Sequence, residues 1–294
     1  MLKKGIYSAT LSIINKDNSL NVEETIKHAE STIKEGLHGV FFFGSTGQSQ
    51  LISTQGKKEL ISTIASHKLK KQFYLGTGCN SFKENSELIS YAVEYGFNYF
   101  LVMPPAYYKG NTEKGVYNFY EGLIKENPKA KLILYNFEKL SGFKFSVEFV
   151  KKLVDAFPKN IVGCKDSTYN LFEVLKLPNF LMFPGSESKL LKGLELGCAG
   201  CITATANVTH SLARKVFDDF ENKKDQTTNS HLIAVREAFE NFNLITAVHT
   251  FLGEINDKYK NVLPPLTLLN QEDKIKLLDK LKSLKFLFNT NIAA

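Results

Sequence analysis

Residues 161–167 read IVGCKDS, an apolar, β-rich run that turns polar at its end. Seven more runs of this kind recur along the chain, and most are continuously apolar, as is typical of strands covered on both faces. Amphipathic segments lie between them; Leu60, Ile61 and Ile64, for example, share one helical face. The pattern predicts repeated β-α units, whose other strands are residues 5–14, 39–45, 72–78, 99–105, 131–137, 180–186 and 200–206.

Eight β-α units in about 210 residues predict an α/β fold of the (β/α)8 TIM-barrel type. An open nucleotide-binding sheet would want a GxGxxG turn after its first strand, but residues 15–21 read NKDNSLN, without glycine. After residue 207 the pattern becomes helical only, with Pro264-Pro265 interrupting the chain between two helices. We therefore expect a barrel over residues 1–225 and a C-terminal helical extension over residues 226–294.

The bulk composition excludes several classes of protein. The 294 residues are 43% hydrophobic and 23% charged, an ordinary globular balance. No apolar run approaches the ~18 residues of a membrane helix, and the N-terminus lacks a signal-peptide cleavage pattern. The net charge of +7 comes from scattered lysines, without zinc-finger spacing or an aromatic-basic RNA motif. We therefore expect neither a membrane nor a nucleic-acid partner.

The cysteines form no regular disulfide framework, which favours a reducing, cytoplasmic location. A single CxxC at Cys198 and Cys201 is weak evidence for a metal, and two small buried thiols are the preferred interpretation. Cys164 precedes Lys165 in a strand, so it should point into the helix layer. The histidines show no HxH or HExxH spacing, and no metal site is predicted.

The chemistry of a barrel gathers at the C-terminal ends of its strands. Lys165, Tyr135, Ser45 and Thr46 all stand at such ends, so they should share one pocket. Burial favours the neutral, nucleophilic form of a lysine amine, which attacks a ketone to form a Schiff base. A nearby tyrosine can carry the proton, and the hydroxyls and amides of the Ser45 turn can hold a carboxylate. The alternatives for the lysine are a surface position or a structural pair with Asp166.

Five motifs follow one another along the chain: GSTGQ at 44–48, PPAYY at 104–108, YN at 135–136, VGCKDST at 162–168 and GCITATANV at 200–208. In this order and spacing they resemble the dihydrodipicolinate synthase/N-acetylneuraminate lyase family of pyruvate-dependent class I aldolases. The resemblance spans nearly the whole chain, and Pro264-Pro265 also fits it.

The resemblance implies a role for each matching residue. Lys165 would form the Schiff base with pyruvate, Tyr135 would transfer protons, and Thr46 would relay them. Tyr107 resembles the tyrosine that family tetramers lend across a subunit interface. The resemblance also implies a homotetramer, built as a dimer of dimers, that needs no metal or organic cofactor. The candidate substrate-binding residues are Ser45, Gly47, Ser167, Gly185, Glu187 and Ile202.

Departures from the family pattern concern the second substrate. Leu140 stands where dihydrodipicolinate synthases carry an arginine, although Lys139 is adjacent. The YN at 135–136 followed by LSG at 140–142 resembles the neuraminate lyases. Those enzymes carry two acidic residues after the seventh strand, whereas here only Glu187 is present, followed by Ser188. Our hypothesis is a pyruvate-dependent aldolase or lyase for a 2-keto-3-deoxy sugar acid or related 2-oxo acid. A 4-hydroxy-tetrahydrodipicolinate synthase and an inactive binding protein are the alternatives.

Overall fold

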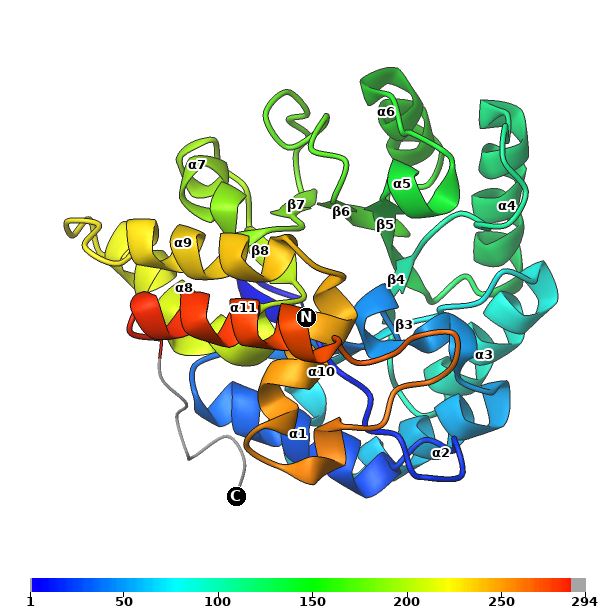
Figure 1. The fold of residues 1–294 in the computed structure, drawn as a ribbon. Helices are drawn as coiled ribbons and strands as arrows, with labels where there is room; N and C mark the ends of the chain where they lie inside the picture. Colours follow the sequence, from blue (N-terminus) through cyan, green and yellow to red (C-terminus); the bar gives the residue numbers. More distant parts are fainter. Residues whose placement is uncertain (1, 287–294) are drawn as a thin grey trace.

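The computed structural model describes residues 2–286, which form eight parallel strands with helices around them (Figure 1). Seven ladders join neighbouring strands in the order β7-β6-β5-β4-β3-β2-β1-β8. The Ala199 amide donates to the Met182 carbonyl (2.8 Å) and links β7 to the residue before β8. The predicted (β/α)8 barrel is confirmed. Its strands are β1 Gly5–Ala9, β2 Gly39–Phe42, β3 Phe73–Gly76, β4 Tyr99–Val102, β5 Lys131–Asn136, β6 Ile161–Asp166, β7 Leu181–Pro184 and β8 Gly200–Thr203.

Each strand begins within one residue of its predicted start but ends earlier than predicted. β2, for example, ends at Phe42, and the next residues enter a 3-10 turn, η1 (Ser45–Gly47). β8 ends at Thr203, and α8 already begins at Ala206. The sequence stays apolar beyond the last hydrogen bond between strands, because the residues at the barrel mouth are still buried. The predicted strand ends are therefore turns, and these turns carry the candidate site residues.

The helices begin where the sequence supplies capping side chains. Asn21, Ser53, Ser81, Thr112 and Ser146 each accept a hydrogen bond from a backbone N–H in the first turn of the helix that follows. Each helix then packs an apolar face onto the barrel. The helices of the barrel are α1 Val22–Lys34, α2 Thr54–Ile64, α3 Phe82–Glu94, α4 Glu113–Glu126, α5 Glu138–Ser141, α6 Val147–Ala156, α7 Leu190–Glu195 and α8 Ala206–Glu221.

One connection lacks the helix that a regular β-α repeat would supply. Residues 167–180, between β6 and β7, contain no helix. The buried Asp166 carboxylate organises their first part, because it accepts backbone N–H groups from Thr168, Tyr169, Leu171 and Phe172 at 2.8–3.2 Å. One side chain thus satisfies donors that a helix would otherwise pair.

The two faces of the strands build two apolar layers. Outward-facing side chains pack under the helices, and Cys164 belongs to this layer, as predicted. Inward-facing side chains fill the barrel, so its interior is a packed core. They include Tyr7, Phe41, Tyr74, Leu101, Ile133, Tyr135, Phe183 and Ile202.

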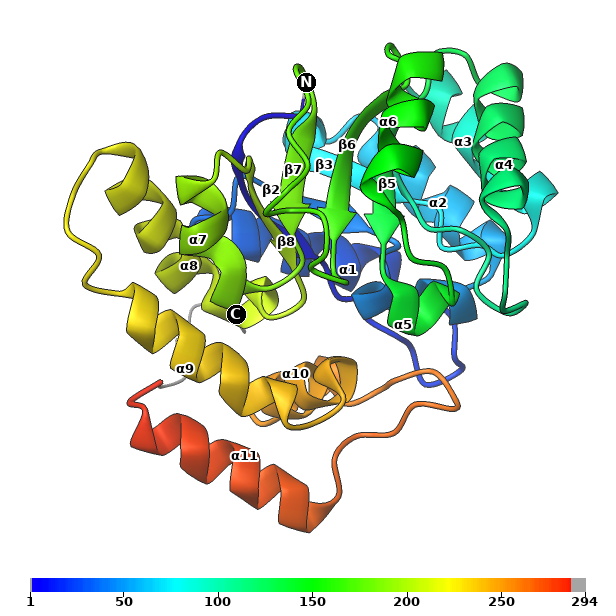
Figure 2. The same cartoon turned by 90° about the horizontal axis from the view of Figure 1, so that it is seen from above.

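The C-terminal segment folds as α9 Asn229–Glu240, α10 Leu244–Gly253 and α11 Gln271–Ser283. They form a third apolar cluster that includes Leu11, Ile13 and Val208 of the barrel. Figure 2 shows the three helices together at the barrel end toward which β5 and β6 point. The helices that the sequence predicts here are present, and the domain boundary at residue 225 remains a prediction.

Within residues 2–286, no helix is long and apolar enough to cross a membrane. All four cysteines are buried and free, as the interpretation of Cys198 and Cys201 as small buried thiols requires. No group of three potential ligands among these residues could hold a metal ion.

Candidate active site

Lys165 points into the barrel from β6, opposite Tyr135 on β5. The two residues are register partners in the parallel ladder, so their side chains leave the same face. The Lys165 Nζ lies 3.2 Å from the Tyr135 hydroxyl oxygen and 4.3 Å from the centroid of its ring. The lysine is only 3% exposed, which rules out the surface position. The amine and the phenol are thus held together inside one wall of the barrel.

Asp166 does not pair with Lys165. Besides the four amides of the β6–β7 loop, its carboxylate accepts the Asn136 side-chain amide at 2.8 Å. Adjacent residues of a strand point to opposite faces, so this carboxylate lies away from the amine. The described residues offer Lys165 no carboxylate partner. The structural-pair interpretation is therefore wrong, and the role of the aspartate is to fix the loop after the lysine.

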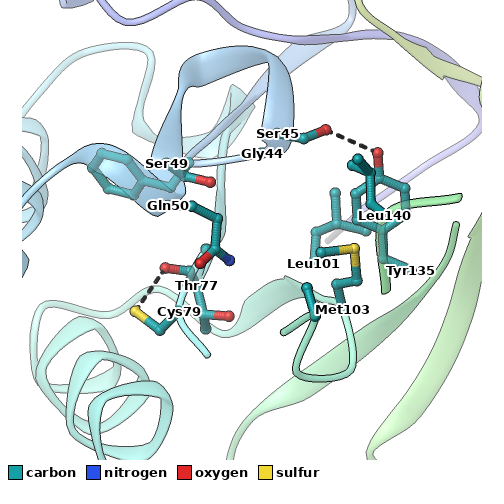
Figure 3. A pocket seen from close by; sticks show the side chains of 13 residues that line it. Gly44, Ser45, Ser49, Gln50, Thr77, Cys79, Leu101, Met103, Tyr135 and Leu140 are labelled. Atoms are coloured by element: carbon teal, nitrogen blue, oxygen red, sulfur yellow. Dashed lines mark hydrogen bonds between the residues drawn. The ribbon is translucent and has the colours of Figure 1, made fainter. Parts of the chain in front are cut away.

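Ser45 extends the amine–phenol pair by a third group. Its hydroxyl lies 3.0 Å from the Tyr135 hydroxyl. Figure 3 marks this contact with a dashed line. Both Ser45 and the buried Thr46 belong to η1, whose Gly47 amide donates to the Gly44 carbonyl. A Cβ at Gly47 would lie 2.8 Å from the Thr10 carbonyl oxygen, so a glycine lets the turn approach β1. Amine, phenol and hydroxyl form one connected chain.

A cavity of about 140 Å³ opens beside this chain, between the ends of β2, β3, β4 and β5 (Figure 3). Ser45 and Tyr135 line it, and so does Leu140 of α5, which is 38% exposed at its mouth. Tyr135 lines this cavity, whereas the Lys165 amine does not line it and lies 3.2 Å from the Tyr135 hydroxyl. The arrangement can bind a carbonyl compound, attack it and move its protons.

The remaining candidates from strands 6, 7 and 8 divide into two groups. Ile202 is fully buried in the same interior cluster as Tyr135. Ser167 and Gly185 pack against each other, and a Cβ at Gly185 would overlap the Ser167 Oγ. These residues belong to the barrel mouth, but they do not line the cavity in Figure 3.

Glu187 does not line the cavity. Its fully buried carboxylate accepts the hydroxyls of Thr203, Thr205 and Thr209 at 2.6–2.9 Å and pairs with the Arg236 Nη1 at 3.2 Å. Arg236 belongs to α9, so the pair ties the barrel to the C-terminal helices. The expected contact between Glu187 and substrate hydroxyls does not fit this geometry, because protein groups already occupy both carboxylate oxygens.

Tyr107 also lies apart from the cavity. Its side chain is 80% exposed and packs edge-on against Tyr108, with ring centroids 5.3 Å apart. The loop that follows β4 presents both rings to solvent in the isolated chain. The prediction that Tyr107 acts across a subunit interface stays a prediction.

Sequence reasoning missed residues at the strand ends that line the cavity. Thr77 follows β3 and Met103 follows β4, so their place at a predicted strand end was the available signal. It also missed the role of Gln48, whose side-chain oxygen accepts the Leu263 amide at 2.6 Å and whose nitrogen lies 3.2 Å from the His249 Nε2. This residue joins the η1 turn to the C-terminal extension, a contact between residues 215 positions apart that no local pattern reveals.

Comparisons with known proteins agree with this architecture. The model of the dihydrodipicolinate synthetase family matches residues 2–284. An uncharacterized DapA-like lyase of Chloroflexus aurantiacus is 28% identical over 278 residues, covering 92% of this chain and 93% of that protein. An N-acetylneuraminate lyase of Histophilus somni is 33% identical over 224 residues, covering 73% and 74%.

Solved structures show the same fold. YagE, a prophage protein of the dihydrodipicolinic acid synthase family from E. coli solved in complex with pyruvate, superposes with a TM-score of 0.87 at 23% identity, covering 98% of this chain and 100% of that one. The dihydrodipicolinate synthase of Agrobacterium tumefaciens also gives 0.87, at 22% identity, covering 96% and 99%. With the family model matched along nearly its whole length, the chain belongs to the dihydrodipicolinate synthetase family and is an enzyme of the lyase class.

Proposed function

We propose that this enzyme is a Schiff-base, pyruvate-dependent aldolase or lyase that acts on a 2-keto-3-deoxy sugar acid or a related 2-oxo acid. One observation carries the proposal. The buried Lys165 amine has a phenol 3.2 Å away and no carboxylate partner among the described residues. A buried lysine without a counter-charge is costly to a fold unless it is used.

The geometry supports the following sequence of steps. The neutral Lys165 amine adds to the C2 carbonyl of pyruvate, and water leaves to give an iminium. The Tyr135 hydroxyl, 3.2 Å from the Nζ and 3.0 Å from the Ser45 hydroxyl, gives and takes the protons. The Ser45 hydroxyl holds the pyruvate carboxylate, and Thr46 relays protons.

Loss of a proton from C3 converts the iminium to an enamine. Its C3 attacks the aldehyde carbon, and the aldehyde oxygen takes up a proton to become a hydroxyl. Water then hydrolyses the new iminium and frees Lys165. Cleavage of the 2-oxo acid runs through the same steps in reverse.

The runner-up is the condensation of pyruvate with aspartate semialdehyde, as a 4-hydroxy-tetrahydrodipicolinate synthase performs it. Leu140 argues against this function, because an apolar side chain lines the cavity where dihydrodipicolinate synthases carry an arginine. The third alternative is an inactive binding protein. Such a protein would have no need for the connected amine, phenol and hydroxyl of Lys165, Tyr135 and Ser45.

Borohydride trapping tests the proposal. The protein is mixed with pyruvate, reduced and weighed intact, with Lys165→Ala as the matched control. We expect a mass gain of one reduced pyruvate on the wild type and none on the variant. An unmodified wild type, or an adduct that persists in the variant, would refute the Schiff base.

Substrate assays separate the two enzymatic alternatives. Pyruvate release is measured from 2-keto-3-deoxygluconate and from N-acetylneuraminate, and condensation is measured with aspartate semialdehyde. Release without condensation is the expected result, and efficient condensation would favour the synthase.

The homotetramer and the cytoplasmic location belong to the same proposal. The exposed Tyr107 and Tyr108 rings and the four free cysteines support them. The molecular mass in solution tests the first, and localisation of a tagged chain tests the second.

A further inference from the structure

A second cavity, of about 500 Å³, opens at the other end of the barrel, where the neighbouring strands β1, β2 and β3 begin. This end faces away from the helices α9 to α11 (Figure 2). The volume lies within the range of small-molecule sites. The side chains that line it include Lys3, Lys4, Tyr7, His38, Lys71 and Tyr74. The reaction proposed above uses none of them.

Three ammonium groups surround this cavity without a counter-charge. Among the described residues no carboxylate lines the cavity, and none forms an ion pair with its three lysines. Other lysines of the run that ends at Lys71 are engaged: Lys68 pairs with Glu30 at 3.5 Å, and Lys70 donates to the Tyr95 carbonyl at 2.7 Å. Like charges gathered at one cavity attract an anion, because its binding relieves their mutual repulsion.

The other polar groups of the cavity favour an anion as well. The Ile6 amide donates to the His38 Nδ1 at 3.0 Å, and burial lowers the pKa of this histidine to about 4. The ring is therefore neutral, with its proton on Nε2. Burial raises the pKa of Tyr7 and of Tyr74, so both phenols keep their protons. The cavity thus offers N–H and O–H donors and no negatively charged side chain among the described residues.

Two aromatic rings add an apolar surface to this cationic cavity. The rings of Tyr7 and Tyr74 meet edge to face, with centroids 5.6 Å apart. The Tyr7 hydroxyl donates to the Lys3 carbonyl at 2.9 Å, which ties the segment before β1 to the ring. An aromatic surface beside ammonium groups suits an organic molecule with anionic groups better than a bare inorganic ion.

Core side chains separate this cavity from the active site. The Tyr7 ring packs edge-on against Phe41 and Phe183, with centroids 5.7 and 5.8 Å apart. Phe183 is in turn the register partner of Lys165. The cavity is therefore a separate site, and binding there does not require pyruvate on the lysine.

We infer that this cavity binds a phosphorylated small molecule, with its phosphate groups at the three lysines and its organic part against the two tyrosine rings. A phosphate monoester carries a charge of about −1.5 to −2, which matches several ammonium groups better than one carboxylate does. A nucleotide and a sugar phosphate share this chemistry. The inference goes beyond the proposed function and does not depend on it.

Calorimetric titration of the intact protein tests the inference at low ionic strength, where charge pairing is least screened. The probes are ADP, fructose 1,6-bisphosphate, pyrophosphate and citrate. We expect ADP or fructose 1,6-bisphosphate to bind once per chain, severalfold more tightly than pyrophosphate and at least about tenfold more tightly than citrate. The tighter of the two identifies a nucleotide or a sugar phosphate as the ligand.

Two double variants remove the same charge at different places. Lys3→Gln/Lys71→Gln removes two cations of the cavity and should weaken binding by about tenfold or more. Lys151→Gln/Lys159→Gln removes two exposed lysines at and after α6 and is the control, which should change the affinity by less than about twofold.

Four outcomes would overturn the inference. The absence of saturable binding would refute the site, and equal weakening by the two double variants would reduce it to the net charge of the protein. Citrate binding as tightly as the phosphate compounds would refute the preference for phosphate. Pyrophosphate binding as tightly as both organic phosphates would refute the contact with the tyrosine rings.

Discussion

Two buried side chains with ionisable groups, Glu187 and Lys165, lie at the same end of this barrel, and their surroundings differ completely. Glu187 is surrounded by three hydroxyls and a guanidinium, all within hydrogen-bond distance. Lys165 has a single phenol within that distance and a cavity beside the phenol. The first arrangement is fully satisfied, which suits a structural tie. The second leaves capacity for a substrate.

Removing the amine should have the largest effect on catalysis. Lys165→Met keeps a long, flexible side chain but cannot form an iminium. We expect kcat to fall by about 10⁴-fold or more, with the melting temperature near that of the wild type. Steady-state kinetics and a thermal melt check both. Substantial residual turnover would place the nucleophile elsewhere.

Tyr135→Phe removes only the hydroxyl and keeps the ring that packs in the barrel. Because the phenol links the amine to Ser45, we expect kcat to fall by about 10²- to 10⁴-fold while slow borohydride trapping of pyruvate persists. Rapid-quench trapping and turnover assays separate the two steps. A variant with normal turnover would assign proton transfer to another group.

Breaking the ion pair between Glu187 and Arg236 should lower the stability of the fold, whereas the two preceding variants lower kcat. Arg236→Met leaves the Glu187 carboxylate buried without its cation, and we expect a loss of about 3–5 kcal/mol in the free energy of unfolding. Urea denaturation measures it. Arg214→Met, which breaks a half-exposed ion pair with Asp218, is the control and should cost less than about 1 kcal/mol.

The double variant Glu187→Gln/Arg236→Met sharpens that result. It removes the unpaired charge, so it should recover part of the stability that Arg236→Met loses. No recovery would mean that the arginine acts by packing rather than by pairing.

Low pH should destabilise the fold through two buried histidines, His28 and His249. Burial lowers the pKa of His28 and of His249 to about 4, from an unfolded value of 6.5. The unfolded chain therefore binds more protons between these values, and the free energy of unfolding should fall as pH drops from about 6.5 toward 4. Denaturation at several pH values measures the slope. His249→Gln should flatten it, and an unchanged slope would exclude this histidine as a cause.

The barrel could be predicted because each strand leaves a local trace in the sequence, a short apolar run followed by an amphipathic segment. The pairing of Lys165 with Tyr135 followed, since parallel strands end at the same mouth. The ion pair of Glu187 could not be predicted, because its partner Arg236 lies 49 residues away on a helix outside the repeat. The length of α5, which brings Leu140 to the cavity, likewise has no periodic signature.

The hydrogen bonds of Gln48 connect the C-terminal extension to the turn that carries Ser45 and Thr46, so changes in the extension should affect turnover. Gln48 directly follows the turn that holds Ser45 and Thr46. Its side chain hydrogen-bonds with the backbone amide of Leu263 and with the ring of His249. Trimming those helices would therefore loosen the reactive turn even though they contribute no reacting atom. An engineer could adjust the speed of the enzyme from these outer segments without touching the pocket.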